Sequence, residues 1–274
     1  MTEDAVARHY ASDDIARRIL DALRAELGAD AAITPDALAP LDQFHGRGLQ
    51  ATRDLVAMLD PQPDEALLDI GCGIGGPARW IAGKFRCRVT GVDLTPDFVT
   101  AAQALTLATG LADRVSVLRG SALDLPFGAA RFDRAYSQNV VMNIPDKPRF
   151  YAEAFRVLKP GGTLALSNGA RGDGDPYFPV PWAATPDTSF LSTVEQTRRD
   201  IEGAGFRIER FHDATEEIRA QAAAQRPAAP GAAKPSLGLH VWLGDRIKLY
   251  AANSQRSIAE GRVRMLEVLA RKPA

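Results

Sequence analysis

A glycine-dense turn in the first half of the chain has the spacing of a nucleotide-binding site. Residues 67–76 are Leu-Leu-Asp-Ile-Gly-Cys-Gly-Ile-Gly-Gly. A short apolar run that contains one acid, Asp69, is therefore followed by a turn. The glycines of the turn are Gly71, Gly73, Gly75 and Gly76. A helix pattern starts at Pro77, a residue favoured at the first helical position. Such a turn lets the backbone approach a ligand, and the free N–H groups at the helix start bind its polar groups.

A second acid follows at the distance expected for ribose recognition. The strand pattern over residues 88–93 ends in Asp93, 22 residues after Gly71, and Leu94 comes next. A carboxylate there can accept hydrogen bonds from both ribose hydroxyls. The turn also satisfies the dinucleotide pattern G-x-G-x-x-G, so a nicotinamide cofactor stays open at this point. Asp69 extends the pattern to D-x-G-x-G-x-G, although its alternative role is to cap the strand end.

This constellation resembles motif I of the class I S-adenosylmethionine-dependent methyltransferases. Three later segments resemble the same family, namely residues 120–127, 136–139 and 158–162. In that family the turn passes under the methionine part of the cofactor, and the acid after the second strand takes the ribose hydroxyls. The resemblance covers residues 66–170. It implies S-adenosylmethionine as the cofactor and S-adenosylhomocysteine as the product.

The flanking segment over residues 41–52 resembles a narrower group, the type 11 methyltransferases. That group includes the glycine, sarcosine and dimethylglycine N-methyltransferases and the tocopherol- and quinone-type C-methyltransferases. This chain has Arg47 in place of a glycine, Asn143 in place of a histidine, and Ser121 where the family often has Asp or Asn. Together the resemblances imply the following cofactor-binding residues: Gln43, Phe44, Asp69, Gly71, Gly73, Gly75, Asp93, Leu94, Ser121, Ala122, Leu123 and Gln138.

Three side chains are candidates for catalysis of methyl transfer, which needs a base only where the nucleophile carries a proton. His45 lies in the matched flanking segment, and we expect it to orient the acceptor or act as a weak base, with a structural role as the alternative. Tyr10 is expected to precede the first helix, where it either closes over the site or packs that helix on the core. His240, in an apolar run, is either a base or a satisfied core histidine. Asn139 and Asn143 supply no metal-binding carboxylate, so we expect no metal.

The amino-acid composition limits the classes of molecule that the protein is expected to bind. The chain has 274 residues, with 33 Lys and Arg against 34 Asp and Glu and a net charge of −1, which gives no electrostatic footprint for nucleic acid. Its two cysteines are too few for a disulfide framework. The N-terminus is polar, and no apolar run approaches a membrane span, so we expect a cytoplasmic protein with a small-molecule acceptor. The oligomeric state is not encoded in any pattern we recognise.

From residue 66 the chain alternates strand and helix patterns, which predicts a parallel sheet with right-handed crossovers. The family resemblance adds an antiparallel last strand. We therefore expect an α/β, Rossmann-like class I methyltransferase fold with a seven-stranded, mostly parallel sheet and a helical cap. The predicted parts are an N-terminal helical cap (1–60), the cofactor-binding core (61–212), a cap insertion (213–260) and the last core strand (261–274).

Two local features complete the expected organisation. Ser12 is available as the cap of a helix that ends at Gly28. The stretch 220–235 consists mostly of Ala, Pro and Gln, and we expect it to be a mobile loop.

The sequence favours a small-molecule methyltransferase, with N-methylation of an amine as the first expectation. The alternative is C- or O-methylation of a phenolic, quinone or other apolar metabolite. From other classes, a nicotinamide-dependent oxidoreductase and a non-catalytic ligand-binding protein remain open, because a fold does not fix a function.

Overall fold

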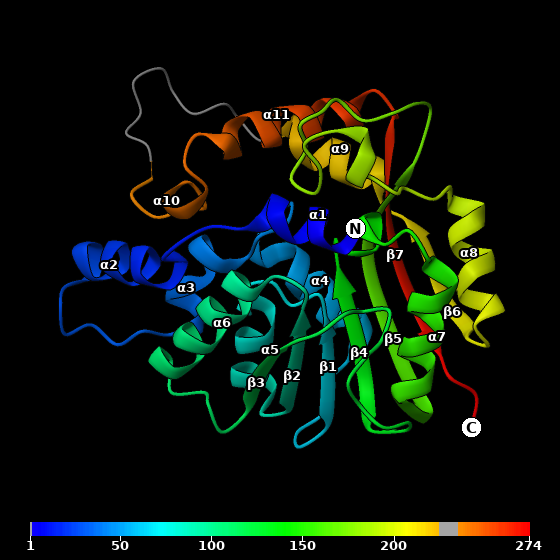
Figure 1. Cartoon of the computed structure of the whole chain (residues 1–274), viewed down its shortest axis with the longest axis horizontal. Coiled ribbons are helices and arrows are strands. Elements are labelled where there is room, and N and C mark those ends of the chain that lie inside the picture. Colours follow the sequence, from blue (N-terminus) through cyan, green and yellow to red (C-terminus); the bar gives the residue numbers. More distant parts are fainter. Residues whose placement is uncertain (1, 225–234) are drawn as a thin grey trace.

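A seven-stranded sheet forms the centre of the computed structural model, which describes residues 2–224 and 235–274 (Figure 1). Its strands are β1 (Ala66–Ile70), β2 (Arg88–Asp93), β3 (Val115–Arg119), β4 (Phe132–Gln138), β5 (Leu158–Arg171), β6 (Arg207–Asp213) and β7 (Val263–Arg271). Their order is β3-β2-β1-β4-β5-β7-β6, and β7 runs antiparallel to both of its neighbours. This arrangement confirms the predicted sheet and its antiparallel last strand.

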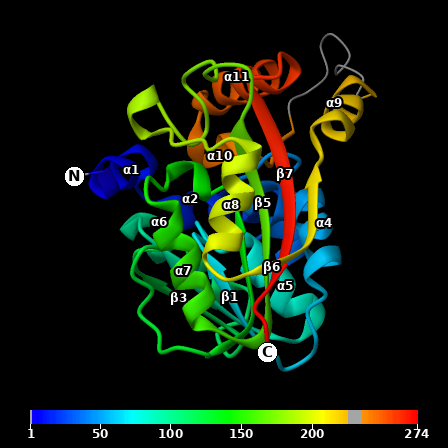
Figure 2. The same ribbon diagram turned by 90° about the vertical axis from the view of Figure 1, so that its right-hand side faces the viewer.

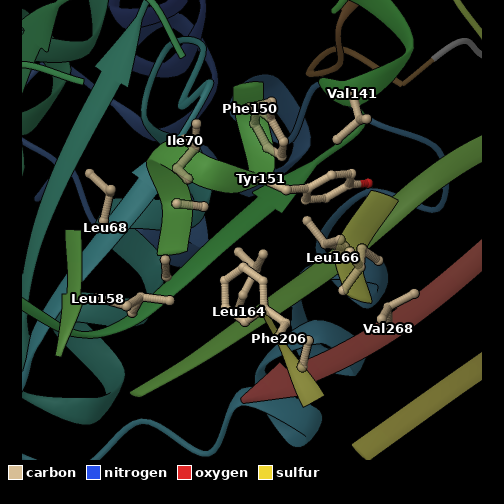
Figure 3. Close-up of a cluster of buried hydrophobic side chains, with 14 of the residues drawn as sticks. Leu68, Ile70, Val141, Phe150, Tyr151, Leu158, Leu164, Leu166, Phe206 and Val268 are labelled. Atoms are coloured by element: carbon tan, nitrogen blue, oxygen red, sulfur yellow. The ribbon is translucent and has the colours of Figure 1, made fainter. Parts of the chain in front are cut away.

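The apolar run of β1 is buried on both faces, as a central strand of a parallel sheet must be. Leu68 and Ile70 point to one face, where they meet aromatic residues of the covering helix α7 such as Phe150 and Tyr151 (Figure 3). Leu67 points to the opposite face and joins a second cluster. Since successive side chains of a strand alternate, Leu67 supplies one core while Leu68 and Ile70 supply the other.

Helices cover both faces of the sheet. The face of Leu68 is covered by α7 (Lys147–Val157) and α8 (Val194–Gly203). The face of Leu67 is covered by α4 (Leu49–Leu59), α5 (Gly76–Phe85) and α6 (Pro96–Ala108). We grouped α4 with the N-terminal cap, yet its Leu55, Val56 and Leu59 pack in the cluster under the sheet. The division of the chain into cap and core stays a prediction.

The remaining helices gather where the parallel strands end. These are α1 (Thr2–Tyr10), α2 (Ile15–Leu27), α3 (Pro35–Asp42), α9 (Thr215–Ala224), α10 (His240–Leu243) and α11 (Arg246–Ala259), with the short 3-10 helices η1 (Val141–Asn143) and η2 (Pro186–Thr188). Side chains from α2, α3, α6 and α10 form one apolar cluster around Trp242. In Figures 1 and 2, α11 lies above the strands, near the start of β7.

Three local expectations need correction. Ser12 does not cap α2, because the residue before the helix is Asp14, and the Ser12 N–H donates to Asp97 instead. Tyr10 does not precede the first helix but ends α1. Residues 220–224 of the expected mobile loop belong to α9, and residues 225–234 lie outside the described part of the chain.

Membrane crossing needs a long apolar helix. Among the residues that the structure describes, no helix combines the length and the hydropathy that a membrane span requires.

Candidate active site

A cavity of about 550 Å³ lies at the ends of the parallel strands, between the sheet and the helices gathered above it. We call its first part the cofactor half, which contains Gly71, Gly73, Asp93, Leu94, Ala122 and Leu123, from the turns that follow β1, β2 and β3. We call its second part the acceptor half, which contains Met142, Trp182, Ile218, Ser254, Ile258 and Met265. Elements distant in sequence therefore share one cavity.

The glycine turn has the backbone that its sequence requires. Gly71, Gly73 and Gly75 have φ values of 80°, 54° and 78°, a region that glycine adopts without strain. A Cβ on Gly71 would lie 2.4 Å from a methyl carbon of Val140. The N–H of Gly71 donates to Val92 O at 2.8 Å, which ties the turn to the end of β2. The Val140 side chain therefore leaves no room for a side chain at Gly71, whereas the bare backbone of Gly73 borders the cavity.

Asp93 holds this turn from the next strand. Its Oδ2 accepts from the N–H of Gly73 at 2.8 Å, and its Oδ1 accepts from the N–H of Thr95 at 2.9 Å. Burial raises the pKa of Asp93, and these N–H donors oppose that shift. Each carboxylate oxygen keeps a further lone pair, so the side chain can still accept from a pair of ribose hydroxyls.

Asp69 presents an unpaired carboxylate oxygen at the cavity wall. Its side chain is 2% exposed, and its Oδ2 has no hydrogen-bond partner among the described residues. Burial raises the pKa of Asp69 to about 8. A buried acid with one unpaired oxygen favours a cationic ligand, and S-adenosylmethionine carries a sulfonium and an ammonium group. The orphaned oxygen and the bare glycine backbone together fit this cofactor.

The turn after β3 lines the cavity with Gly120, Ala122 and Leu123, but Ser121 does not line it. The Ser121 hydroxyl donates to Glu3 of α1, and its oxygen accepts from the N–H of Leu123. The expected contact of Ser121 with the adenine therefore stays a prediction, and its hydroxyl already has two partners.

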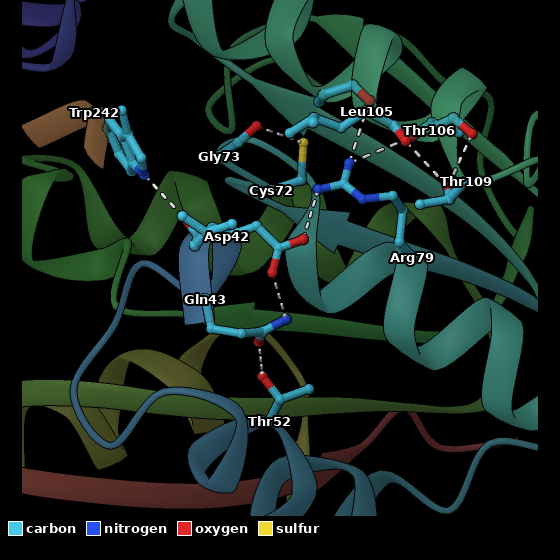
Figure 4. Close-up of polar contacts among 12 residues, drawn as sticks. Asp42, Gln43, Thr52, Cys72, Gly73, Arg79, Leu105, Thr106, Thr109 and Trp242 are labelled. Atoms are coloured by element: carbon cyan, nitrogen blue, oxygen red, sulfur yellow. Dashed lines mark hydrogen bonds and ion pairs between the residues drawn. The ribbon is translucent and has the colours of Figure 1, made fainter. Parts of the chain in front are cut away.

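Polar side chains meet behind the wall between the two halves (Figure 4). Thr52 Oγ1 lies 2.7 Å from Gln43 Oε1, 3.2 Å from His45 Nε2 and 3.3 Å from Gln138 Oε1. His45, Phe44 and Gln138 line the cavity, whereas Gln43 is 2% exposed and lies behind it. Burial lowers the pKa of His45 to about 4, so its imidazole is neutral at physiological pH. This favours the orienting role of His45 over the role of a base.

The other two catalytic candidates lie in different surroundings. Tyr10 lines the cavity and donates to Asn143 Oδ1 at 2.9 Å, which connects α1 to η1. Burial raises the pKa of Tyr10, so its hydroxyl is protonated. His240 is exposed and is not part of the cavity wall. The structure thus brings His45 and Tyr10 to the site and leaves His240 outside it.

No group of three or more His, Cys, Asp or Glu side chains within residues 2–224 and 235–274 could hold a metal ion. The polar side chains of the cavity wall in that part of the chain include isolated acids, amides, hydroxyls, one imidazole and the guanidinium of Arg47.

Comparison with known proteins supplies the family. Residues 68–166 match the model of a methyltransferase domain. The methyltransferase GfsG of Streptomyces halstedii is 31% identical over 198 residues, which are 71% of this chain and 70% of that protein. The chain belongs to the methyltransferase family. This methyltransferase uses S-adenosylmethionine and acts on small molecules, as the sequence predicted.

One further relative and one solved structure of similar fold are named for different methyl acceptors. The phosphoethanolamine N-methyltransferase of Triticum aestivum is 30% identical over 172 residues, and these cover 63% of this methyltransferase but only 33% of that protein. The geranyl diphosphate C-methyltransferase of Streptomyces coelicolor A3(2), solved with Mg²⁺, geranyl diphosphate and S-adenosyl-L-homocysteine, superposes with a TM-score of 0.68 at 18% identity. The superposition covers 99% of this chain and 97% of that one, and it shows a shared fold.

Sequence reasoning missed most of the acceptor half of this methyltransferase. Thr52 had no assigned role, and the wall residues of α11 were not expected. One signal was available, because Ile247, Ala251, Ser254 and Ile258 recur at helical spacing and all line the cavity. Val263 and Met265 of β7 also line the cavity and have the two-residue spacing of a strand, whereas no periodicity marks Met142, a residue of the short helix η1.

Proposed function

We propose that this methyltransferase transfers a methyl group to the nitrogen of a small amine whose remaining body is apolar. The observation that carries the proposal is the character of the acceptor half. Its wall consists largely of Met142, Trp182, Ile218, Ile258 and Met265, with the neutral hydroxyl of Ser254 among them. Such a wall stabilises apolar surface and penalises a charged group that finds no partner there.

Charge along the cavity supports a neutral acceptor. Among the described residues of the wall, Arg47 is the only Lys or Arg. Its Nη1 lies 2.6 Å from Asp54, and its Nη2 lies 3.4 Å from Glu267, so both ends of the guanidinium are engaged. A phosphate-bearing acceptor would need free cationic donors, and the wall offers none of them in the part of the chain described.

The protein's own task is placement. When bound, the cofactor supplies a methyl group already activated by its sulfonium. The wall must hold the nucleophile on a common axis with that methyl at about 3–3.5 Å and exclude water. An apolar wall also lowers the pKa of an amine, because burial disfavours the charged form, and so keeps the nitrogen lone pair free. A phenol would need a base, and His45, with a pKa of about 4, is too weak a base for that purpose.

The test is methyl transfer from radiolabelled S-adenosylmethionine to three matched acceptors. These are an apolar primary amine such as phenethylamine, a phenol of the same size, and phosphoethanolamine. We expect the amine to have the highest kcat/KM. Preferred transfer to the phenol would contradict the proposal and favour the alternative, methylation of a phenolic acceptor. Preferred transfer to phosphoethanolamine would contradict the apolar character of the site.

A substitution that fills the acceptor half with a larger side chain gives an independent check of where the methyl acceptor binds. Ser254→Phe places a ring in the acceptor half, and we expect the KM for the acceptor to rise about tenfold or more, since overpacking typically costs about 1–3 kcal/mol. Leu249→Phe is the matched control, because Leu249 lies on the same helix but is 52% exposed. Cofactor affinity should stay within about twofold of the original value in both variants. Equal KM values in the two variants would remove Ser254 from the acceptor half.

The composition supports a proposal for the location of the enzyme and for the class of its partner. We propose a cytoplasmic enzyme with a small molecule as its partner rather than a nucleic acid. The net charge of −1 supports the small-molecule partner. Cys72 and Cys87 are both buried free thiols, which is typical of a reducing compartment.

A further inference from the structure

Two buried polar atoms at the cavity wall have no partner within hydrogen-bond geometry in the described structure, although the backbone of Gly46 partly opposes the lowering of the His45 pKa. They are Nδ1 of His45 and Nε2 of Gln138. The side chains that carry them approach the same hydroxyl, because Thr52 Oγ1 lies 3.2 Å from His45 Nε2 and 3.3 Å from Gln138 Oε1. Thr52 itself is fully buried on α4. Buried polar groups are nearly always hydrogen-bonded, so this cluster is arranged for a partner that enters the cavity.

A buried ion pair fixes the direction of the contacts behind this cluster (Figure 4). Arg79 Nη2 donates to Asp42 Oδ2 at 2.9 Å, and the two side chains are 0% and 1% exposed. Since a guanidinium does not lose its proton, Asp42 is its carboxylate counterion. Gln43 Nε2 donates to the other carboxylate oxygen at 3.3 Å, so the carbonyl oxygen of Gln43 must face Thr52.

The hydroxyl of Thr52 has one proton and two lone pairs. The short contact of 2.7 Å to Gln43 Oε1 takes the proton. His45 must then donate through Nε2, which leaves Nδ1 unprotonated and free as an acceptor. The contact of 3.3 Å between Thr52 Oγ1 and Gln138 Oε1 is also satisfied when the Gln138 amide turns by half a rotation. Its Nε2 then donates to Thr52, and its carbonyl oxygen faces the cavity.

We infer that Thr52, Gln43 and the Arg79–Asp42 pair are positioning residues, which hold His45 Nδ1 and Gln138 Oε1 toward the cavity as two acceptors for N–H groups of the methyl acceptor. This assigns Gln138, a cofactor-binding residue in the family resemblance, to the methyl acceptor instead, and the part that names N–H groups rests on the proposed function. A primary amine has two N–H groups and one lone pair, so two acceptors in the wall can hold both N–H groups and leave the lone pair free. The enzyme therefore favours a primary amine over its N,N-dimethyl analogue.

The tautomer of His45 is the direct readout and needs no acceptor. Long-range ¹H–¹⁵N spectra of the labelled protein resolve four histidines, and the signal missing from His45→Gln assigns His45. We expect the neutral tautomer with the proton on Nε2 in the wild type and in Thr52→Ser. Thr52→Val removes the hydroxyl and should give a mixture of tautomers. Thr163→Val is the matched control, because Thr163 is a buried threonine that does not line the cavity, and its spectrum should match the wild type.

A wild-type His45 that carries its proton on Nδ1 overturns the inference, whether or not any variant folds. An unchanged tautomer in folded Thr52→Val overturns it as well. These spectra test the relay separately from the acceptor class. If the tautomer shifts as expected and no amine is methylated, the relay stands and the proposed acceptor class fails.

Kinetics test the role of the two acceptor atoms. Thr52→Val should lower kcat/KM for a primary amine about 10- to 100-fold, the range typical of lost orientation, while cofactor affinity stays within about twofold. Thr52→Ser should restore most of the activity. The preference for the primary over the dimethylated amine should be at least about tenfold in the wild type and should shrink in Thr52→Val. His45→Ala should slow turnover by a similar factor. Equal preferences in the wild type and in Thr52→Val contradict the inference.

Discussion

The cofactor half and the acceptor half of the cavity are built in different ways. The cofactor half consists largely of backbone at the ends of adjacent parallel strands, with Gly71 and Gly73 at positive φ and one carboxylate, Asp93, that accepts from the N–H of Gly73. The acceptor half consists of side chains from η1, α9, α11, β7 and the loop before η2. A site made of backbone constrains residue type at fixed spacing, whereas a site made of side chains constrains only shape and polarity.

The contrast between the two halves is tested most directly by adding a single carbon atom, the Cβ of an alanine, to the glycine turn. Gly71→Ala should have the largest effect of the changes considered, with cofactor affinity lower by about 100-fold or more. A left-handed backbone costs an alanine about 1–2 kcal/mol, and the overpacked methyl adds about 1–3 kcal/mol. The second cost arises because the new Cβ would lie 2.4 Å from Val140. Calorimetric titration with S-adenosylhomocysteine measures the loss.

Gly128→Ala is the matched control. No heavy atom lies within 4 Å of its added Cβ, and its φ is not positive. We expect unchanged affinity and stability there. If Gly71→Ala binds as tightly as this control, the cofactor half does not depend on its bare backbone, and the contrast between the halves disappears.

This contrast explains what the sequence could predict. Gly71, Gly73 and Asp93 lie as expected because parallel strand ends meet at one edge, and the turn needs these residue types. The strand and helix alternation from residue 66 predicted the parallel part of the sheet, whereas the order of the strands came from the structure. Gln43 lies behind the cavity wall, because its contacts with Asp42 and Thr52 depend on how α3 and α4 pack, and its expected contact with the cofactor stays a prediction. His240 was a candidate through its apolar neighbours, yet Leu239 faces the cavity and His240 faces solvent.

Asp93→Ala should have the next largest effect. It removes a charge-assisted acceptor of the cofactor, at a cost of about 1.5–3 kcal/mol in binding free energy. It also frees the N–H of Gly73, which Asp93 Oδ2 accepts at 2.8 Å. Asp93→Asn keeps the shape and one acceptor oxygen, so we expect an intermediate loss. Calorimetry that finds unchanged affinity in Asp93→Ala would remove Asp93 from the cofactor site.

Protonation of Asp69 should make both the stability of the protein and the binding of the cofactor depend on pH. Its pKa is about 8 in the folded protein, against an ordinary value of 3.8, because burial disfavours the carboxylate. Between these two values the folded state holds one proton more than the unfolded state, so the free energy of unfolding falls as pH rises toward 8 and levels off above it. A cationic cofactor favours the carboxylate, so binding at pH 7 should release a proton.

Titration in two buffers of different ionisation enthalpy measures that release. We expect up to about one proton per cofactor and an affinity that rises by less than about tenfold per pH unit between pH 6 and pH 8. Asp69→Asn should abolish both effects while it keeps the shape of the side chain. Asp93, whose pKa burial also raises, is the other source of a proton at this site. Asp93→Asn, which leaves Asp69 intact, should therefore retain most of the release, and its complete loss there would assign the proton to Asp93.

Ser121→Ala should have the smallest effect, and it decides which part of the molecule Ser121 serves. Its hydroxyl donates to Glu3 of α1 and does not line the cavity. One partly exposed hydrogen bond contributes little net free energy, so we expect cofactor affinity to fall only about two- to fivefold.

The informative quantity is the coupling free energy for cofactor binding between Ser121→Ala and Glu3→Ala. If Ser121 acts by holding α1 over the cofactor, either single variant already loses the contact, and the double variant binds no worse than the singles. If Ser121 instead contacts the adenine, the two losses add, because the residues then act independently. Additive losses would return Ser121 to the cofactor half, and non-additive losses would make α1 a lid that Ser121 and Glu3 hold closed.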